Sequence, residues 1–430
     1  MAIRLNRSDP DFDARFTALL GAKREVAEDV DAVARAIVDD VRRRGDAALI
    51  DLTARFDRLT LTPDRLRIAD AEIEAAEAAV SAEAKAALVV ARDRIEAFHR
   101  RQLPQDDRYR DSLGVDLGIR WTPIDAVGLY VPGGTAAYPS SVLMNAVPAK
   151  VAGVPRVALV VPTPDGLLNP LVLAAARIAG VDEVYRIGGA QAIAALAHGT
   201  RSIPAVAKIV GPGNAYVAAA KRLVFGTVGI DMIAGPSEVL VIADGGNDPD
   251  WIAADLLAQA EHDTAAQSVL ITDSKELADG VEAAVVAQLR ALPRSEIAGQ
   301  SWRDHGAVIV IDDLSAAIEL ANRLAPEHLE LAVAEPEAWL AGIRNAGAVF
   351  LGRHTPEAIG DYVAGPNHVL PTARSARFSS GLSVFDFLKR TTVLGLGPDQ
   401  LRALAGPAIT LAGAEGLEAH ARSVSIRLNR

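Results

Sequence analysis

The stretch from Asp248 to Asp263 carries two possible metal ligands at helical spacing. Asp248 suits an N-cap and Pro249 suits the first helical position, so we expect a helix to begin there. Gln259 and His262 lie three positions apart and are therefore neighbours on the helix surface. An amide oxygen and an imidazole nitrogen at that spacing can hold one metal ion. The segment also fits an ordinary, partly exposed helix end, which is the commoner case.

Glu327 and His328 pair a carboxylate with an imidazole directly after Pro326. In a helix, adjacent side chains do not share a face, so the two would serve different points of a site. Imidazole titrates near neutrality and a carboxylate can activate water, and both are general-base roles. The same residues fit the start of a surface helix, with Glu327 near the positive end of the helix dipole.

Two further segments carry ligand-type side chains. From Gly360 to Pro371, glycine and proline surround Asp361 and His368 and impose an irregular backbone, a setting in which polar residues often form a site. Near the C-terminus, Glu415 and His420 lie a little more than one helical turn apart. On its own, a histidine in that position is expected to be solvated.

Two glycine-containing segments fit a phosphate site. Gly211-Pro212-Gly213-Asn214 and Gly188-Gly189 each follow an expected strand and open an expected helix, where backbone N–H groups bind phosphate well. The dinucleotide fingerprint is incomplete, because Tyr216 occupies the place of its third glycine. The pattern predicts an anion or nucleotide site without specifying NAD.

Composition excludes several classes of protein. The 430 residues carry a net charge of −11 with both signs mixed along the chain, so we expect no nucleic-acid partner. The start lacks the apolar stretch of a secretory signal, and the most apolar region, 142–161, is interrupted by charge and proline. We therefore expect no membrane segment and a cytoplasmic location. Cysteine is absent, which excludes disulfides, thiolate metal ligands and a cysteine nucleophile.

The elements that position these residues follow an α/β pattern, because Ala-rich helical stretches alternate with Val/Ile-rich strands. Strands are predicted at 116–131, 157–161, 183–187, 207–210, 238–243, 268–272, 307–311, 348–351 and 424–428. Helices are predicted at 28–44, 71–101, 169–179, 191–197, 215–225 and from about 381 to 422. Strands separated by single helices imply parallel sheets.

We expect two Rossmann-like parallel-sheet domains, one inserted in the other. Residues 1–128 with 239–375 would form the first domain, which carries the candidate metal and catalytic residues. Residues 129–238 would form the second domain, on the nucleotide side, and 376–430 a helical C-terminal extension.

Taken together, these segments resemble the histidinol dehydrogenase family over essentially the whole chain. The motifs that carry the resemblance are Gly128-Leu129-Tyr130-Val131-Pro132-Gly133-Gly134, Val210-Gly211-Pro212-Gly213-Asn214, Ala234-Gly235-Pro236-Ser237-Glu238, Gln259-Ala260-Glu261-His262-Asp263, Pro326-Glu327-His328-Leu329-Glu330 and the segment from Gly360 to Pro371. The resemblance implies the NAD-dependent oxidation of L-histidinol via L-histidinal to L-histidine, which forms the last steps of histidine biosynthesis.

The resemblance also implies a role for particular residues. One zinc ion per subunit would be held by Gln259, His262, Asp361 and His420. His328 would be the general base, and Glu327 would activate water. NAD would lie near Tyr130, Gln191 and Asn214. Substrate contacts would come from Ser237, Gln259, His262, His328, Asp361, Glu415 and His420. The family forms intertwined homodimers with shared active sites, so Glu415 and His420 would reach the site of the partner subunit.

Other functions stay open from the residues alone. A related zinc- and NAD-dependent dehydrogenase of another amino or sulfonated alcohol would use the same side chains, and two histidines with two oxygen ligands suit zinc without excluding manganese or cobalt. A zinc hydrolase would use Glu327 or His328 to activate water without a nucleotide. A non-catalytic binding module accounts least well for so many ligand-type residues.

Overall fold

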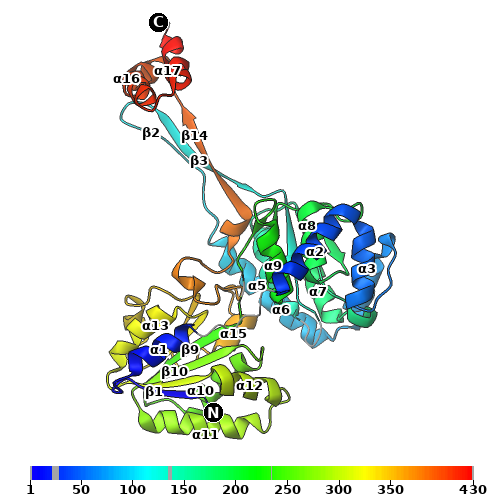
Figure 1. Cartoon of the computed structure of the whole chain (residues 1–430), viewed down its shortest axis with the longest axis vertical. Coiled ribbons are helices and arrows are strands. Elements are labelled where there is room, and N and C mark those ends of the chain that lie inside the picture. The colour runs from blue at the N-terminus through cyan, green and yellow to red at the C-terminus, as the bar shows by residue number, and fades with distance from the viewer. Residues whose placement is uncertain (1, 22–28, 134–137, 234, 429–430) are drawn as a thin grey trace.

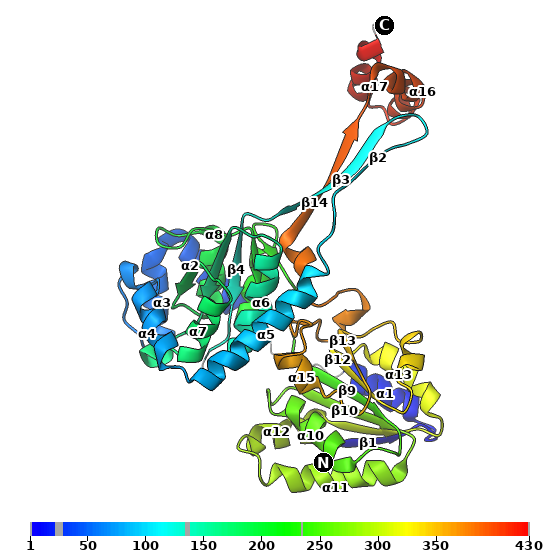
Figure 2. The ribbon, with the colours of Figure 1, turned by 180° about the vertical axis from the view of Figure 1, so that it is seen from behind.

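The computed structural model describes residues 2–21, 29–133, 138–233 and 235–428, and these form two parallel sheets with their helices and one antiparallel arm (Figures 1 and 2). Gly134 and Ala234, which belong to the motifs above, lie outside the described residues, as does Glu28 at the start of a predicted helix.

One parallel sheet has six strands in the order β1, β11, β10, β9, β12, β13. Its strands are β1 (Ile3–Asn6), β9 (Glu238–Ala243), β10 (Gln267–Thr272), β11 (Ala307–Val310), β12 (His328–Ala332) and β13 (Ala348–Leu351). One face packs on α1 (Phe12–Gly21) and α13 (Ala317–Leu324), and the other on α10 (Pro249–Ala260), α11 (Lys275–Leu289) and α12 (Ser295–His305). Covering both faces buries whole strands, and β9 and β10 accordingly have no exposed residue. The short helices α14 (Glu337–Leu340) and α15 (Glu357–Tyr362) complete this unit.

The second parallel sheet has five strands in the order β6, β5, β4, β7, β8. They are β4 (Ala126–Tyr130), β5 (Arg156–Val160), β6 (Glu183–Tyr185), β7 (Lys208–Val210) and β8 (Gly229–Ile230). One face packs on α4 (Asp70–Ala79), α5 (Ala82–Arg100), α6 (Pro139–Val151) and α7 (Pro170–Ile178). The other packs on α2 (Asp29–Arg44), α3 (Asp46–Phe56), α8 (Gly189–His198) and α9 (Ala215–Val224).

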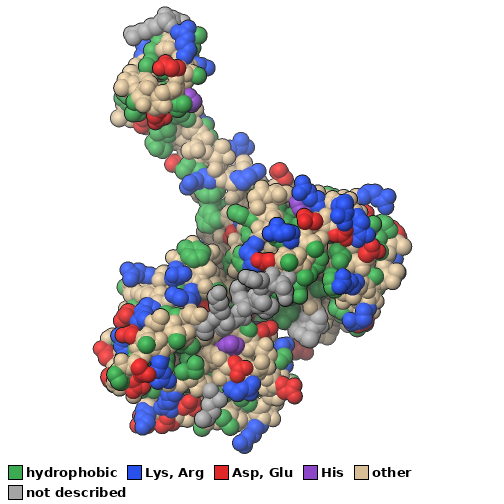
Figure 3. All heavy atoms as spheres, in the orientation of Figure 1, with side chains coloured by type: hydrophobic (Ala, Val, Ile, Leu, Met, Phe, Trp, Pro, Cys, Tyr) green, Lys and Arg blue, Asp and Glu red, His purple; other side chains and the backbone are tan. Residues whose placement is uncertain are grey.

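The arm is an antiparallel sheet with two terminal helices. Its strands, in the order β14, β3, β2, are β14 (Leu388–Gly395), β3 (Asp116–Pro123) and β2 (Asp107–Arg110), and the helices are α16 (Pro398–Ala414) and α17 (Glu418–Ser425). Both ribbon views show the arm projecting away from the two parallel-sheet units. Hydrophobic side chains are visible on its surface in Figure 3, and Leu394 and Leu411 are 66% and 64% exposed. The arm therefore leaves apolar surface uncovered in a single chain.

Most predicted elements are confirmed to within a few residues, and the expected parallel sheets are present. The predicted helix at 71–101 is interrupted, because Val80 and Ser81 are extended and the Ser81 hydroxyl caps α5 by accepting from the Ala84 N–H at 3.2 Å. The predicted helix after Gly381 is wrong for residues 388–395, where Thr391, Thr392 and Val393 fit the pleat of β14. Residues 424–428 are helical and not a strand.

The packing of the N-terminal residues departs in part from the expected domain grouping. β1 pairs with β11 and α1 packs on the same sheet, as grouping 1–128 with 239–375 requires. In contrast, α2 to α5 pack on the β4–β8 sheet, and β2 and β3 belong to the arm. The apolar face of a helix does not indicate, in the sequence, which of two similar sheets the helix will cover. No helix within the described ranges combines the length and apolarity needed to cross a bilayer.

Candidate active site

A cleft of about 900 Å³ lies where the two parallel sheets meet. On one side it is lined by the loops that follow the carboxyl ends of β4 and β7, including Gly133, Gly213 and Asn214. On the other side it is lined by residues at the amino ends of β9 and β12, including Ser237 and His328. The carboxyl end of a parallel sheet beside helix starts is where nucleotides bind in α/β proteins.

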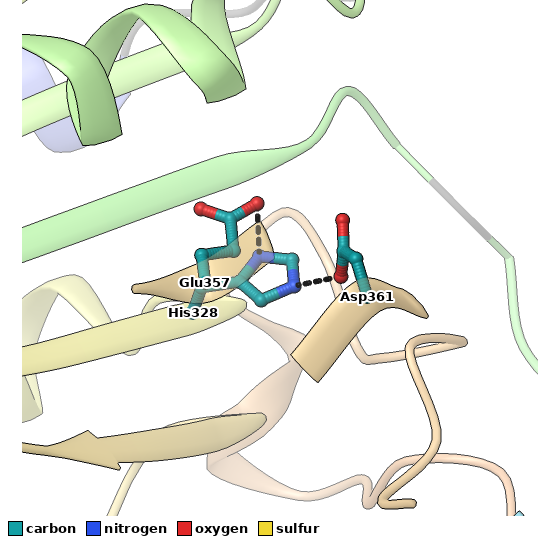
Figure 4. A group of neighbouring side chains, drawn as sticks. All are labelled: His328, Glu357 and Asp361. Carbon is teal, nitrogen blue, oxygen red and sulfur yellow. Dashed lines mark ion pairs between the residues drawn. The ribbon is translucent and has the colours of Figure 1, made fainter. Parts of the chain in front are cut away.

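His328 lies at the amino end of β12, between β9 and β13, and is 4% exposed. Its Nδ1 is 3.2 Å from the carbonyl oxygen of Glu238, and its Nε2 is 3.6 Å from Oδ1 of Asp361 (Figure 4). Among the described residues, Nε2 has no hydrogen-bond partner. Glu327 and His328 were also interpreted as the possible start of a surface helix, and this interpretation is wrong. The apolar residues Leu329 and Leu331 alternate with Glu330 in a buried strand.

Three carboxylates surround this imidazole. Burial by itself lowers the pKa of His328, but Glu357, Glu327 and Asp361 raise that pKa well above its ordinary value. Oε2 of Glu327 accepts a hydrogen bond from the Glu238 N–H at 3.0 Å, and burial raises the pKa of Glu327 to about 7 in spite of His328. The site therefore combines an imidazole that readily holds a proton with a carboxyl group that titrates near neutrality, which suits acid–base chemistry.

Glu357 belongs to this site although the sequence alone does not single it out. Its Oε1 lies 3.6 Å from Nδ1 of His328, and burial raises the pKa of Glu357 to about 8. Its backbone N–H donates to Oε1 of Glu330 at 2.6 Å, which ties the start of α15 to β12. The available signal was the spacing of Glu357 and Asp361, which are four residues apart and so share a helix face.

A metal ion could be held at two overlapping places. His328, Glu357 and Asp361 form a group of the described residues whose ligand atoms lie within 4.8 Å of one another. This group shares only Asp361 with the predicted zinc ligands. Burial works to raise the pKa of Asp361, but His328, His368 and His262 together lower it, and both Asp361 and His262 line the cleft.

The other two predicted ligands on this chain lie next to each other at the end of α10. The Gln259 amide is 2.9 Å from Nδ1 of His262. With its oxygen toward that nitrogen, its NH₂ group donates to the Glu238 carbonyl at 3.3 Å and to Oε1 of Glu357 at 3.2 Å. In this arrangement Nδ1 of His262 carries the proton, which leaves Nε2 with the lone pair that a metal ligand needs.

The remaining predicted site residues fall into two groups. Asn214 lines the cleft and caps α9, and its Oδ1 accepts from the N–H groups of Tyr216 and Val217, both at 3.1 Å. Tyr130 and Gln191 are buried behind the glycine loops, and the Tyr130 hydroxyl accepts from the Gly189 N–H at 3.1 Å.

Glu415 and His420 are exposed residues of the arm, and the structure does not bring them to the cleft of the same chain (Figure 1). His368, in contrast, lines the cleft. Its Nδ1 is 3.0 Å from the Asp361 carbonyl, and its Nε2 is 3.3 Å from the Ser141 hydroxyl.

Two parallel α/β units that enclose an acid–base histidine and a glycine-lined cleft define a two-unit α/β enzyme. The chain belongs to the histidinol dehydrogenase family, whose model matches residues 21–428. It is 70% identical over 429 residues to histidinol dehydrogenase of Rhizobium meliloti, covering 100% of this chain and 99% of the relative. The identity to the Bradyrhizobium diazoefficiens enzyme is also 70%, with 100% of both chains covered.

The same similarity extends to the fold. The crystal structure of histidinol dehydrogenase from Elizabethkingia anophelis matches with a TM-score of 0.95 at 38% identity, covering 100% of this chain and 98% of that one. The chain is thus an oxidoreductase of histidine biosynthesis.

Proposed function

We propose that this chain oxidises L-histidinol via L-histidinal to L-histidine, with one NAD accepting the hydride in each of two successive steps. Family membership and the glycine-lined cleft support this proposal. The observation that carries it is His328, which is buried beside the cleft and has Glu327 as its neighbour in the chain. Its Nε2 lies 3.6 Å from Oδ1 of Asp361 and has no hydrogen-bond partner among the described residues. A buried, unpartnered nitrogen indicates a group that it meets only when a ligand is bound.

His328 would act as the general base in both steps. It takes the hydroxyl proton as the alcohol loses a hydride and releases that proton to solvent. It then takes a proton from the aldehyde hydrate as the second hydride leaves. The Asp361 carboxylate, whose pKa is lowered, would stabilise the imidazolium that each transfer creates, and Glu357 lies 3.6 Å from the other ring nitrogen. A positioned base of this kind contributes about 10²–10⁴-fold to the rate.

Glu327 would activate the water that hydrates the aldehyde. With no cysteine in the chain, a thiohemiacetal cannot form, and the hydrate is the species left to oxidise. Burial keeps the pKa of Glu327 at about 7, so the group can both accept and return a proton near neutral pH.

Gln259, His262 and Asp361 would hold one zinc ion together with His420 of the partner subunit. The donors fit, since Asp361 and His262 line the same cleft, and Gln259 lies beside His262. Two nitrogen and two oxygen donors suit zinc. When bound, the ion supplies a fixed positive charge that orients the amine and imidazole of the substrate. Ser237 and the partner subunit's Glu415 would complete substrate binding, and NAD would lie near Tyr130, Gln191 and Asn214.

The test measures the stoichiometry of NADH formation. Histidinol should yield two NADH per molecule, and a chelator should abolish the reaction. Formation of NADH from a sulfonated diol but not from histidinol would assign another substrate within the family. Ester or amide hydrolysis without NADH would replace the proposal with a hydrolase.

A further inference from the structure

A buried ion pair lies directly behind the Gly211–Asn214 loop that lines the cleft. Lys221 of α9 and Asp231, just after β8, form this pair, and their side chains are 3% and 1% exposed. Oδ2 of Asp231 accepts from the Gly211 N–H at 2.8 Å, and Nζ of Lys221 donates to the Gly211 carbonyl at 3.1 Å. The two charged side chains therefore hold the N–H and the carbonyl of one residue, Gly211, at the start of the loop.

Gly211 needs this support because its backbone conformation is unusual. Its φ is +108°, a value that favours glycine, and a Cβ at this position would lie 2.1 Å from the Tyr130 carbonyl oxygen. Here the chain leaves β7, passes close over the end of β4 and continues through Gly213 to Asn214, the cap of α9. The position of Gly211 thus determines where the N–H groups at the start of α9 point.

The energetics of a buried ion pair favour a geometric role over a stabilising one. Removing two charges from water costs several kcal/mol per ion, by an order-of-magnitude estimate, and well-packed apolar residues often stabilise a fold equally well or better. What an apolar pair cannot do is hold an N–H and a C=O group at fixed positions. The charged pair at Lys221 and Asp231 meets that second requirement.

We infer that Lys221 and Asp231 are positioning residues that hold the Gly211–Asn214 loop in the conformation that receives the diphosphate of a dinucleotide. This inference rests on the proposed use of NAD. Neither side chain is exposed enough to bind the cofactor itself, so both act through Gly211. The loss of their contacts should weaken NAD binding and leave histidinol binding unchanged, because Gln259, His262 and Asp361 lie in or next to α10 and α15, which pack with the other parallel sheet.

Two double variants of matched size provide the test. Lys221→Met with Asp231→Leu removes both charges and both contacts to Gly211. Lys221→Met with Asp231→Asn also removes the charges but keeps an amide oxygen that can accept from the Gly211 N–H. NAD affinity is measured by calorimetric titration, KM for NAD and for histidinol by steady-state kinetics, and folding by thermal unfolding.

We expect the Leu variant to change the affinity for NAD but not the KM for histidinol. The Leu variant should remain folded and bind NAD about tenfold or more weakly, a change of about 1.4 kcal/mol, with KM for histidinol within about twofold of wild type. The Asn variant should recover part of the NAD affinity. Unchanged NAD affinity in a folded Leu variant overturns the inference. A large fall in unfolding temperature with wild-type affinity in the folded fraction also overturns it, because the pair would then serve folding.

Failure of the proposed function gives a different result. If the wild-type protein itself binds no NAD in the titration, the proposal that it uses this cofactor fails, whatever the variants do. If the wild type binds NAD and both variants bind it equally well, only the positioning role fails.

Discussion

Nε2 of His328 faces the Asp361 carboxylate at 3.6 Å (Figure 4), while Nδ1 of the same ring faces the Glu238 carbonyl at 3.2 Å. The ring is thus fixed at one nitrogen by the backbone of β9, and its other nitrogen is directed toward the side chains of α15. A base held in this way keeps a single orientation, which is the requirement for proton transfer along a fixed path.

Substituting the two candidate histidines should affect different kinetic constants. His328→Asn removes the base and should lower kcat by about 10²–10⁴-fold with little change in histidinol affinity. His262→Asn removes a proposed metal ligand and should weaken histidinol binding severely. Steady-state kinetics combined with equilibrium binding measures both constants. The opposite assignment of effects would refute the proposal that His328 is the base and that His262 holds the metal ion that orients the substrate.

Glu327→Gln should separate the two oxidation steps. The amide retains an oxygen that can accept from the Glu238 N–H, so the fold should be preserved. The first hydride transfer needs no water and should proceed near the wild-type rate, whereas oxidation of histidinal should slow by about 10²-fold or more. Single-turnover experiments started with histidinol and with histidinal measure the steps separately. Equal slowing of both steps would argue against a water-activating role.

Gly211→Ala should destabilise the protein far more than Gly226→Ala. Both glycines have positive φ values, +108° and +97°, but only at Gly211 would a Cβ meet backbone, whereas no atom lies within 4 Å of one at Gly226. We expect a loss of about 1–2 kcal/mol at Gly226 and at least about 4 kcal/mol at Gly211. Urea unfolding monitored by circular dichroism measures both losses. Similar losses of unfolding free energy at the two positions would show that the Gly211–Asn214 loop rearranges to relieve the clash.

Removal of metal should abolish activity without unfolding the chain. Of the proposed ligands, His262 and Asp361 line the cleft, and none of the four belongs to the four buried clusters of hydrophobic residues, so the fold does not depend on an ion for its core. A chelator should therefore eliminate NADH formation and leave the circular dichroism spectrum unchanged, and added Zn²⁺ should restore activity. Full activity in metal-depleted protein would contradict the proposal that a metal ion orients the substrate.

Mixing two inactive variants tests whether His420 acts in the partner's site. His262→Asn and His420→Ala should each be inactive alone. In a mixed dimer, one of the two sites would receive an intact His262 from one subunit and an intact His420 from the other. Random exchange should therefore restore about one quarter of wild-type activity. If His420 served its own chain, no mixture would regain activity.

The sequence predicted best those site residues whose local pattern fixes their element. The helix that carries Gln259 was expected because Asp248 caps it and its apolar face repeats at helical spacing. The cap is present, with the Asp248 side chain accepting from the Asp250 N–H at 2.9 Å. Glu327 and His328 were recognised by residue type, but their element was not, because a buried strand of five residues is too short to show its period.

Contacts between distant segments account for what the sequence did not predict. Glu357 meets His328 only because α15 returns from the end of β13 across β12, and no local pattern specifies that packing. The same reason explains why α2 to α5 cover the β4–β8 sheet. The apolar stripe of a helix can be buried against either sheet. Which sheet the helix covers depends on how well the packed surfaces fit in three dimensions.

During synthesis, the strand β1 is made long before β11, the strand with which it pairs. Within the described part of the chain, Ile3–Asn6 has Ala307–Val310 as its one partner strand, and at about 5–20 residues per second a ribosome needs roughly 15–60 s to make the intervening chain. The β4–β8 sheet and its helices emerge complete within that interval. Until Ala307–Val310 has been made, the backbone N–H and C=O groups of Ile3–Asn6 are unpaired and open to pairing with other nascent chains. We therefore expect chaperone protection to matter most for this segment.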